Sequence, residues 1–259
     1  MRLERLLLGA GLCALLGGCV TTNSNHEKLP TTSKAQQAQD AARIHTELGQ
    51  HYMQIGDLQS ALAKLKLALQ FDDSYAPAHT VIAVIYERIN DLPDAEKNYR
   101  RAVELEPKKG MPNNNLGAFL CRIGKSEEAL GYFQRAVADP FYDTPDVAWT
   151  NDGICRMHLN DTAGAENSFR QALKTNPGNA DALYQMARAM YLSNDAFHAS
   201  AFLQRYEALG KPSPAALKLG HDIELRLGDT DAARNYNKRL QSQFPDSEQA
   251  QALNATAKP

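Results

Sequence analysis

The feature that most constrains this chain is the segment 76–109, which contains two short amphipathic helical patterns separated by a polar turn at Asn90 and Asp91. Each half is too short to be stable as an isolated helix in water. If Ala76 is position 1 of a 34-residue unit, small or apolar residues fall at positions 7, 8, 11, 20, 24 and 27, and Pro107 ends the second half. One such helix pair cannot bury its apolar face alone, so the chain must supply neighbouring units.

The same pattern recurs in phase along the chain. Units fall at residues 42–75, 76–109, 110–143, 146–179, 180–213 and 214–247, with a slip of two residues in the Pro-bounded segment 139–145. The pattern resembles the tetratricopeptide repeat (TPR), in which small residues stand where two helices cross closely. We therefore predict an all-α fold, a right-handed TPR superhelix (α-solenoid) of six helix-turn-helix repeats over residues 42–247. Residues 248–259 are predicted to be a polar C-terminal tail with a short helix that frays.

The N-terminal residues are predicted to be a targeting signal rather than part of the fold. Two arginines precede an apolar run over residues 6–16, which is too short to span a bilayer. The run ends in the sequence LGGC, which resembles the processing site of bacterial lipoproteins. Residues 1–18 are therefore predicted to be a lipoprotein signal peptide and Cys19 the acylated first residue of the mature chain. The alternative is an ordinary export signal in which Cys19 occurs by chance.

The segment that follows is predicted to connect the anchor to the folded part. Residues 19–41 are assigned to the lipid anchor and a flexible tether, because the stretch after Cys19 is rich in Thr, Asn and Ser and poor in apolar residues. Val20 rather than Asp follows Cys19. By resemblance to the lipoprotein sorting rule, this favours the outer membrane, with the protein facing the periplasm.

Composition and motifs argue against catalysis and against nucleic-acid binding. The 28 Lys and Arg residues are nearly balanced by 30 Asp and Glu residues, and no run of like charge reaches five. The sequence contains no HExxH, no Cys/His pair at metal-ligand spacing, no Gly-rich phosphate loop and no GxSxG motif. We therefore expect no catalytic residues, no metal, no cofactor, no nucleic-acid partner and no small-molecule substrate. An active site assembled in space from distant residues is the remaining alternative.

Function is expected on the concave face of the solenoid, which the first helix of each unit lines in this architecture. Positions 2, 5, 9, 12 and 13 point into the groove and carry a mixture of apolar and polar residues with Tyr, Met and Arg, which suits protein recognition. The predicted protein-binding groove consists of Arg88, Asn114, Arg122, Tyr184, Arg188 and Tyr191. For the group around Tyr184, a merely solvated face is an equal alternative.

Two cysteines lie on the first helices of adjacent units. Cys121 is at position 12 of the third unit and Cys155 is at position 10 of the fourth. A disulfide requires Cα atoms within about 7 Å, and helix axes about 8–10 Å apart make this possible without favouring it. Buried free thiols are the preferred prediction.

Four short motifs inside the repeats are more specific than the repeat itself. They are NNLGAFLC at 114–121, DPFY at 139–142, NDGIC at 151–155 and FPDS at 244–247. Together with LGGC and the six repeats, they resemble the type IV pilus biogenesis/stability lipoprotein family (PilF/PilW), and the resemblance covers residues 42–248.

The resemblance implies a pilotin-like role. Such proteins bind the secretin that forms the outer-membrane pore for the pilus, and they carry or stabilise it there during ring assembly. The expected function is thus a non-enzymatic outer-membrane lipoprotein whose partners are the secretin and, through acylated Cys19, the membrane. The alternative is a general TPR adaptor for cell-wall or envelope enzymes.

Overall fold

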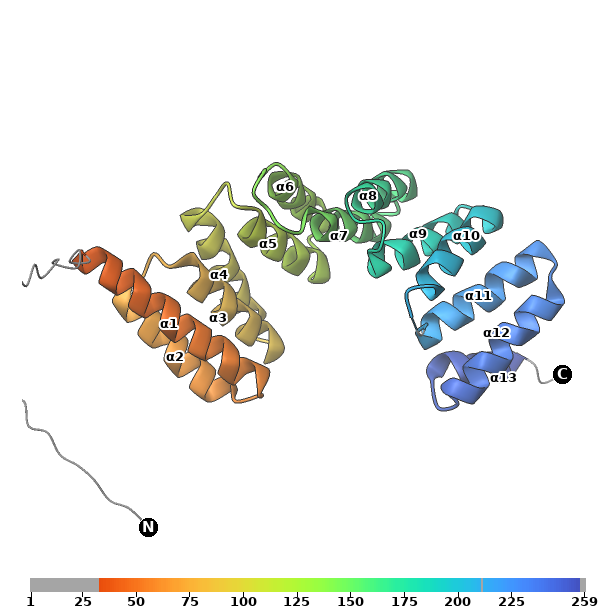
Figure 1. Ribbon diagram of the computed structural model, residues 1–259, viewed down its shortest axis with the longest axis horizontal. Coiled ribbons are helices and arrows are strands. Elements are labelled where there is room, and N and C mark those ends of the chain that lie inside the picture. The colour runs from red at the N-terminus through yellow and green to blue at the C-terminus, as the bar shows by residue number, and fades with distance from the viewer. Residues whose placement is uncertain (1–32, 211, 257–259) are drawn as a thin grey trace, which may run out of the picture.

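The computed structural model describes residues 33–210 and 212–256, which contain thirteen α-helices and no strand (Figure 1). The first twelve helices follow one another as six helix-turn-helix pairs. The pairs are α1 (Lys34–Gln54) with α2 (Leu58–Phe71), α3 (Ala76–Arg88) with α4 (Leu92–Leu105), α5 (Gly110–Arg122) with α6 (Ser126–Val137), α7 (Pro145–His158) with α8 (Thr162–Thr175), α9 (Ala180–Leu192) with α10 (Ala196–Glu207), and α11 (Pro214–Leu227) with α12 (Thr230–Gln243). A last helix, α13 (Glu248–Thr256), follows the sixth pair.

The turn within each pair has the same backbone geometry, which verifies the frame of all six units. Position 15 has a positive φ in every unit, and the residue there is always Gly or Asn, the types that adopt this conformation most readily. These residues are Gly56, Asn90, Gly124, Asn160, Asn194 and Gly228. At position 16, an Asp side chain accepts a hydrogen bond from the first turn of the second helix in five of the six units, as an N-cap does. The capping residues are Asp57, Asp91, Asp161, Asp195 and Asp229.

The two helices of a pair cross where a glycine or alanine at position 8 faces a large residue at position 24. A Cβ added at Gly117 would lie 2.8 Å from Cε1 of Phe133, and Gly49 meets Leu65 in the same way. In the sixth unit the close pair is Gly220 with Tyr236, one residue earlier than the frame predicts. Both members of this pair are displaced together, to positions 7 and 23, while the turn at Gly228 stays at position 15.

The pairs stack into an arch whose inner side is lined by α3, α5, α7, α9 and α11 (Figure 1). By their backbones, the first helices of successive units approach one another closely, whereas in the described part of the chain the second helices of successive units do not. Successive second helices meet instead through long side chains, as Arg100 on α4 does with Glu128 on α6. The closer approach of the first helices bends the stack around them. The predicted all-α TPR solenoid is confirmed.

The ends of the solenoid differ from the prediction. Helix α1 begins at Lys34, so residues 34–41 are helical and do not belong to an extended tether. At the other end, α13 does not fray away from the fold, because Ala250 and Leu253 are buried against Leu217 and Leu240 and cover the last unit. The predicted signal peptide and Cys19 lie outside the described residues.

Candidate functional site

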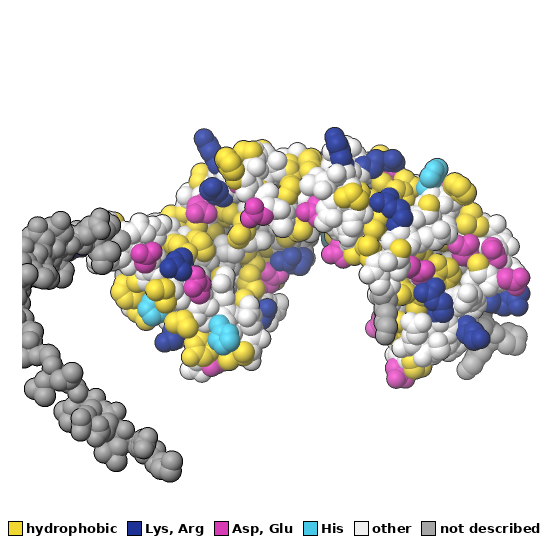
Figure 2. Space-filling model, viewed as in Figure 1, with side chains coloured by type: hydrophobic (Ala, Val, Ile, Leu, Met, Phe, Trp, Pro, Cys, Tyr) yellow, Lys and Arg dark blue, Asp and Glu magenta, His cyan; other side chains and the backbone are white. Residues whose placement is uncertain are grey.

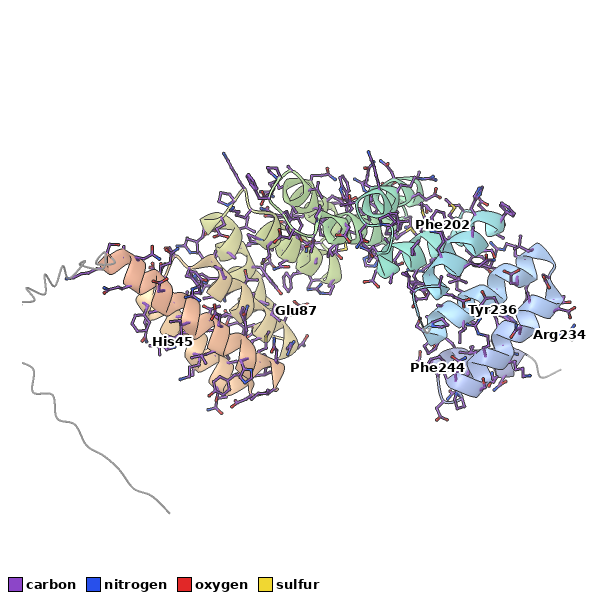
Figure 3. All side chains as sticks on the ribbon, in the orientation of Figure 1. His45, Glu87, Phe202, Arg234, Tyr236 and Phe244 are labelled. Atoms are coloured by element: carbon purple, nitrogen blue, oxygen red, sulfur yellow. A yellow bond between two sulfur atoms is a disulfide. The ribbon has the colours of Figure 1, made fainter. Side chains whose placement is uncertain are left out.

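A pocket of about 550 Å³ lies on the concave side at the second and third units. We call it the Glu87 pocket. It is lined by Val84, Glu87, Arg88, Tyr99, Asn114, Asn115, Ala118, Arg122 and Asn151. Figure 3 shows Glu87 on the inner side of the arch, and Figure 2 shows the hollow that the arch encloses. Three of the six predicted groove residues, Arg88, Asn114 and Arg122, therefore meet in one pocket.

The Glu87 carboxylate organises this pocket. Arg122 donates to it through Nε at 2.7 Å and Nη2 at 2.9 Å, a bidentate pair across two units. The Tyr99 hydroxyl donates to the same carboxylate at 3.0 Å. Burial, together with the adjacent Glu87 charge, raises the pKa of Tyr99 far above its usual range, so this hydroxyl stays protonated as a donor.

Amide groups form the other wall of the Glu87 pocket. Asn151 donates through Nδ2 to Oδ1 of Asn114 at 3.0 Å, which links the third and fourth units. Among the described residues, Asn115 makes no side-chain hydrogen bond, although it lines the pocket. A primary amide has both donors and an acceptor, so this wall is suited to pairing with the backbone of a bound peptide. Arg88, at the rim, donates to the carbonyl of Met53 at 3.2 Å.

The other three predicted residues, Tyr184, Arg188 and Tyr191, lie on α9 and do not line the Glu87 pocket. Tyr184 packs against Tyr206 with ring centroids 5.7 Å apart, and burial raises the pKa of the Tyr184 hydroxyl. The guanidinium of Arg226 lies 3.9 Å from the ring centroid of Tyr191. Arg188 is exposed and within 3.5 Å of Gln185. The predicted groove thus divides into two groups on different units.

The preference for free thiols was wrong, because Cys121 and Cys155 form a disulfide between α5 and α7. Their Cα atoms are 5.7 Å apart, within the range that a disulfide spans. The distance between helix axes, on which the prediction relied, overstates the separation of Cα atoms that face each other at the contact. Both residues are buried.

The loop between α6 and α7 forms a surface that the groove prediction did not include. We call residues 139–142 the Phe141 ridge. Phe141 lines two hollows, one of about 580 Å³ that also touches Met111 and Val147, and one of about 480 Å³ that also touches Pro107 and Arg135. The sequence signal for this surface was an aromatic residue inside a Pro-bounded polar insertion.

Within residues 33–210 and 212–256, no group of three or more His, Cys, Asp or Glu side chains could hold a metal ion. No helix in the same part of the chain is both long enough and apolar enough to cross a bilayer.

Comparison with known proteins connects this architecture to the pilus. Residues 81–143 and 157–220 match tetratricopeptide-repeat sequence profiles. The chain is 27% identical over 249 residues to the type IV pilus assembly protein PilF of Pseudomonas aeruginosa, covering 96% of each chain. It is also 36% identical over 117 residues to an uncharacterized protein of Haemophilus influenzae, covering 45% of this chain and 65% of that one.

Solved structures of pilus biogenesis proteins have the same fold as this chain. The crystal structure of PilW, a widely conserved type IV pilus biogenesis factor, superposes with a TM-score of 0.77 at 32% identity and covers 82% of this chain and 97% of that one. The structure of Pseudomonas aeruginosa PilF also gives a TM-score of 0.77, at 25% identity, and covers 85% of this chain and 99% of that one. The chain therefore belongs to the PilF/PilW family of TPR proteins of type IV pilus biogenesis.

Proposed function

We propose that this protein is a non-enzymatic lipoprotein of the outer membrane, anchored through acylated Cys19 and facing the periplasm. There it binds the secretin subunit of the type IV pilus machinery and promotes its outer-membrane localisation and multimerisation. The observation that carries this proposal is the relation to PilF over 96% of both chains, which extends well beyond a single repeat of the kind that many unrelated TPR proteins share. The LGGC sequence before Val20 supports the anchor.

The Glu87 pocket supports a binding role. Its charged and amide groups are held in place before a ligand arrives, because Glu87 is fixed by both Arg122 and Tyr99 and Asn114 is fixed by Asn151. A preorganised surface loses less conformational entropy on binding than a flexible one. We assign the secretin contact to this pocket and to the second group of residues, Tyr184, Arg188 and Tyr191.

The experiment that tests the function is a deletion strain complemented with variants. Loss of the protein is expected to reduce secretin multimers and surface pili. Cys19→Ala is expected to release the protein into the periplasm and to reduce multimers even though the folded part is intact. Normal multimer levels in the deletion strain would overturn the proposal.

The binding surface is tested separately by co-purification with the secretin. Arg88→Ala with Arg122→Ala, and Tyr184→Ala with Arg188→Ala, are each expected to weaken the complex at least about tenfold. The matched control is Arg101→Ala with Arg170→Ala, two exposed arginines on the second helices α4 and α8 that pair only within their own helix. Enrichment of peptidoglycan enzymes without secretin would instead identify the protein as a general envelope adaptor.

A further inference from the structure

Phe141 is the most exposed large hydrophobic side chain in the described part of the chain, with 82% of its surface open to solvent. When a partner covers an aromatic side chain of this size, the buried apolar surface contributes strongly to the free energy of binding. A phenylalanine that stays in water makes no such contribution. The Phe141 ridge lies on the loop between α6 and α7, not among the residues that line the Glu87 pocket.

The ridge is held rigidly rather than left loose. The Asp139 carboxylate accepts hydrogen bonds from the backbone N–H of Gly110 at 2.8 Å and of Phe141 at 3.0 Å. These two bonds keep the pKa of Asp139 below its usual range. Tyr142 packs so closely on Gly110 that any added Cβ would overlap the Tyr142 side chain. Phe141 is therefore presented from a loop that is fixed on both sides of it, at Asp139 and at Tyr142.

The loop between α4 and α5, which faces the ridge, is fixed as well. The side chain of Asn113 is fully buried, and its Nδ2 donates to the carbonyls of Pro107 at 3.0 Å and Lys109 at 2.8 Å. These bonds set the path of the loop between α4 and α5. The hollow of about 480 Å³ lies between this loop and the ridge, with the rings of Pro107 and Pro140 among its lining. Its volume is enough for a few aliphatic side chains.

Three of the four charged side chains around this hollow are positive. Lys108, Lys109 and Arg135 line it, and none of the three forms an ion pair with any described residue. The single carboxylate in the lining belongs to Asp139, which is already occupied by two backbone N–H groups. The hollow thus combines apolar walls with an excess of positive charge, and its electrostatic complement is an anionic ligand with an apolar part.

We propose that the Phe141 ridge and this hollow form a second docking surface, which binds an extended acidic peptide segment of a partner protein. An aliphatic or proline side chain of the peptide packs between Pro107 and Phe141, and flanking carboxylates pair with Lys108, Lys109 and Arg135. A peptide fits better than an anionic bilayer, because one of its side chains can enter the hollow beside Phe141, whereas a bilayer would cover only the exposed Phe141 ring. This proposal goes beyond the secretin contact assigned to the concave face and does not depend on it.

The test uses the full chain in detergent and two fluorescently labelled peptides, EDLPED and its charge-reversed counterpart KKLPKK, in a fluorescence anisotropy titration. EDLPED is expected to bind and KKLPKK is not. Raising the salt concentration from about 50 mM to about 500 mM is expected to weaken EDLPED binding several-fold, since the cations are exposed. Phe141→Ala, and Lys108→Glu with Lys109→Glu, are each expected to weaken it at least about tenfold.

Matched controls separate the ridge from general effects of charge and exposure. Phe197 on α10 is another exposed phenylalanine, 72% open, and Phe197→Ala is expected to bind EDLPED as the parent does. Lys66→Glu with Lys174→Glu changes the net charge equally on α2 and α8 and is expected to have little effect. Circular dichroism verifies that all variants remain helical.

Three results would overturn the proposal: no binding of EDLPED, an equal loss in the control variants, or a Phe141-dependent association with phosphatidylglycerol vesicles in place of the peptide. These results are independent of secretin multimer levels, so failure here and failure of the proposed function are distinguishable.

Discussion

At the scale of single residues, the glycines at helix crossings determine how closely the two helices of a unit approach. Gly117 on α5 has no room for a side chain, because a Cβ there would lie 2.8 Å from Phe133. Gly131 on α6 is also in a helix, but a Cβ added to it would have no neighbouring atom within 4 Å. The same substitution at these two sites therefore has opposite consequences.

Gly117→Ala is expected to lower the free energy of unfolding by about 1–3 kcal/mol, because the α5–α6 crossing must open or Phe133 must leave its preferred rotamer. Gly131→Ala is expected to raise it by up to about 1 kcal/mol, because alanine loses less backbone entropy in a helix than glycine. Urea denaturation followed by circular dichroism measures both. Equal effects at the two positions would contradict the close-crossing interpretation.

Asp139 gives a residue-scale prediction about pH. Helix α5 has no capping side chain at its own N-terminus, and Asp139 from the loop between α6 and α7 accepts from its Gly110 N–H instead. The pKa of this carboxyl is depressed in the fold, so its ionised form stabilises the folded state. This stabilisation is complete above the pKa of the unfolded chain, about 3.9, and is lost as pH falls through the pKa of the folded state.

The amide proton of Gly110 is therefore expected to shift in NMR spectra with a midpoint below about pH 3.9. The Ala216 amide is a matched control, since the neutral Ser213 hydroxyl caps it at 3.2 Å. It should show no such transition. A midpoint at or above the usual value for Gly110 would contradict the assigned hydrogen bonds.

At the scale of elements, the disulfide joins the first helices of the third and fourth units. It spans 34 residues of sequence. In the chain-entropy description, closing a loop of that length in the unfolded chain contributes roughly 3–4 kcal/mol to stability. The bridge lies between α5 and α7, at the point where the frame slips by two residues and the Pro-bounded loop replaces a regular connection.

Replacing both cysteines by alanine is expected to lower the free energy of unfolding by about 2–4 kcal/mol. Reduction of the parent protein with dithiothreitol is the matched control, because it removes the cross-link without changing the sequence. In urea denaturation, the double variant and the reduced parent protein should have closely similar free energies of unfolding. If the double variant is as stable as the oxidised parent, the bridge does not constrain the unfolded chain.

The elements also show which features a sequence could reveal. Repeat phase was predictable, because a positive φ at position 15 and a small residue at position 8 are required by local backbone geometry and by close helix contact. The one-residue displacement of the Gly220–Tyr236 contact was not, since the turn that sets the frame, at Gly228, stays at position 15 in that unit. The disulfide and the Phe141 ridge depend on which side chains meet between units, and periodicity does not encode that.

At the scale of the whole molecule, the core is a series of local clusters rather than one continuous interior. One buried cluster includes Leu65 and ends at Ile85, and another includes Phe169 and Leu203 and ends at Ile223; the two have no residue in common. Each unit packs mainly on its neighbours, so stability is expected to be approximately a sum of unit and interface contributions.

Leu65 and Leu203 provide a test of this description, because both occupy position 24 of their units and are almost completely buried. Replacing either by alanine is expected to cost about 2–5 kcal/mol locally through lost burial and the cavity that remains. Hydrogen exchange should then accelerate in α1, α2 and α3 for Leu65→Ala, and in α9, α10 and α11 for Leu203→Ala. In each variant the distant half should keep its protection, with the disulfide between α5 and α7 limiting the spread of unfolding. If either substitution accelerates exchange equally in all helices, the solenoid unfolds as one cooperative unit and the nearest-neighbour description is wrong.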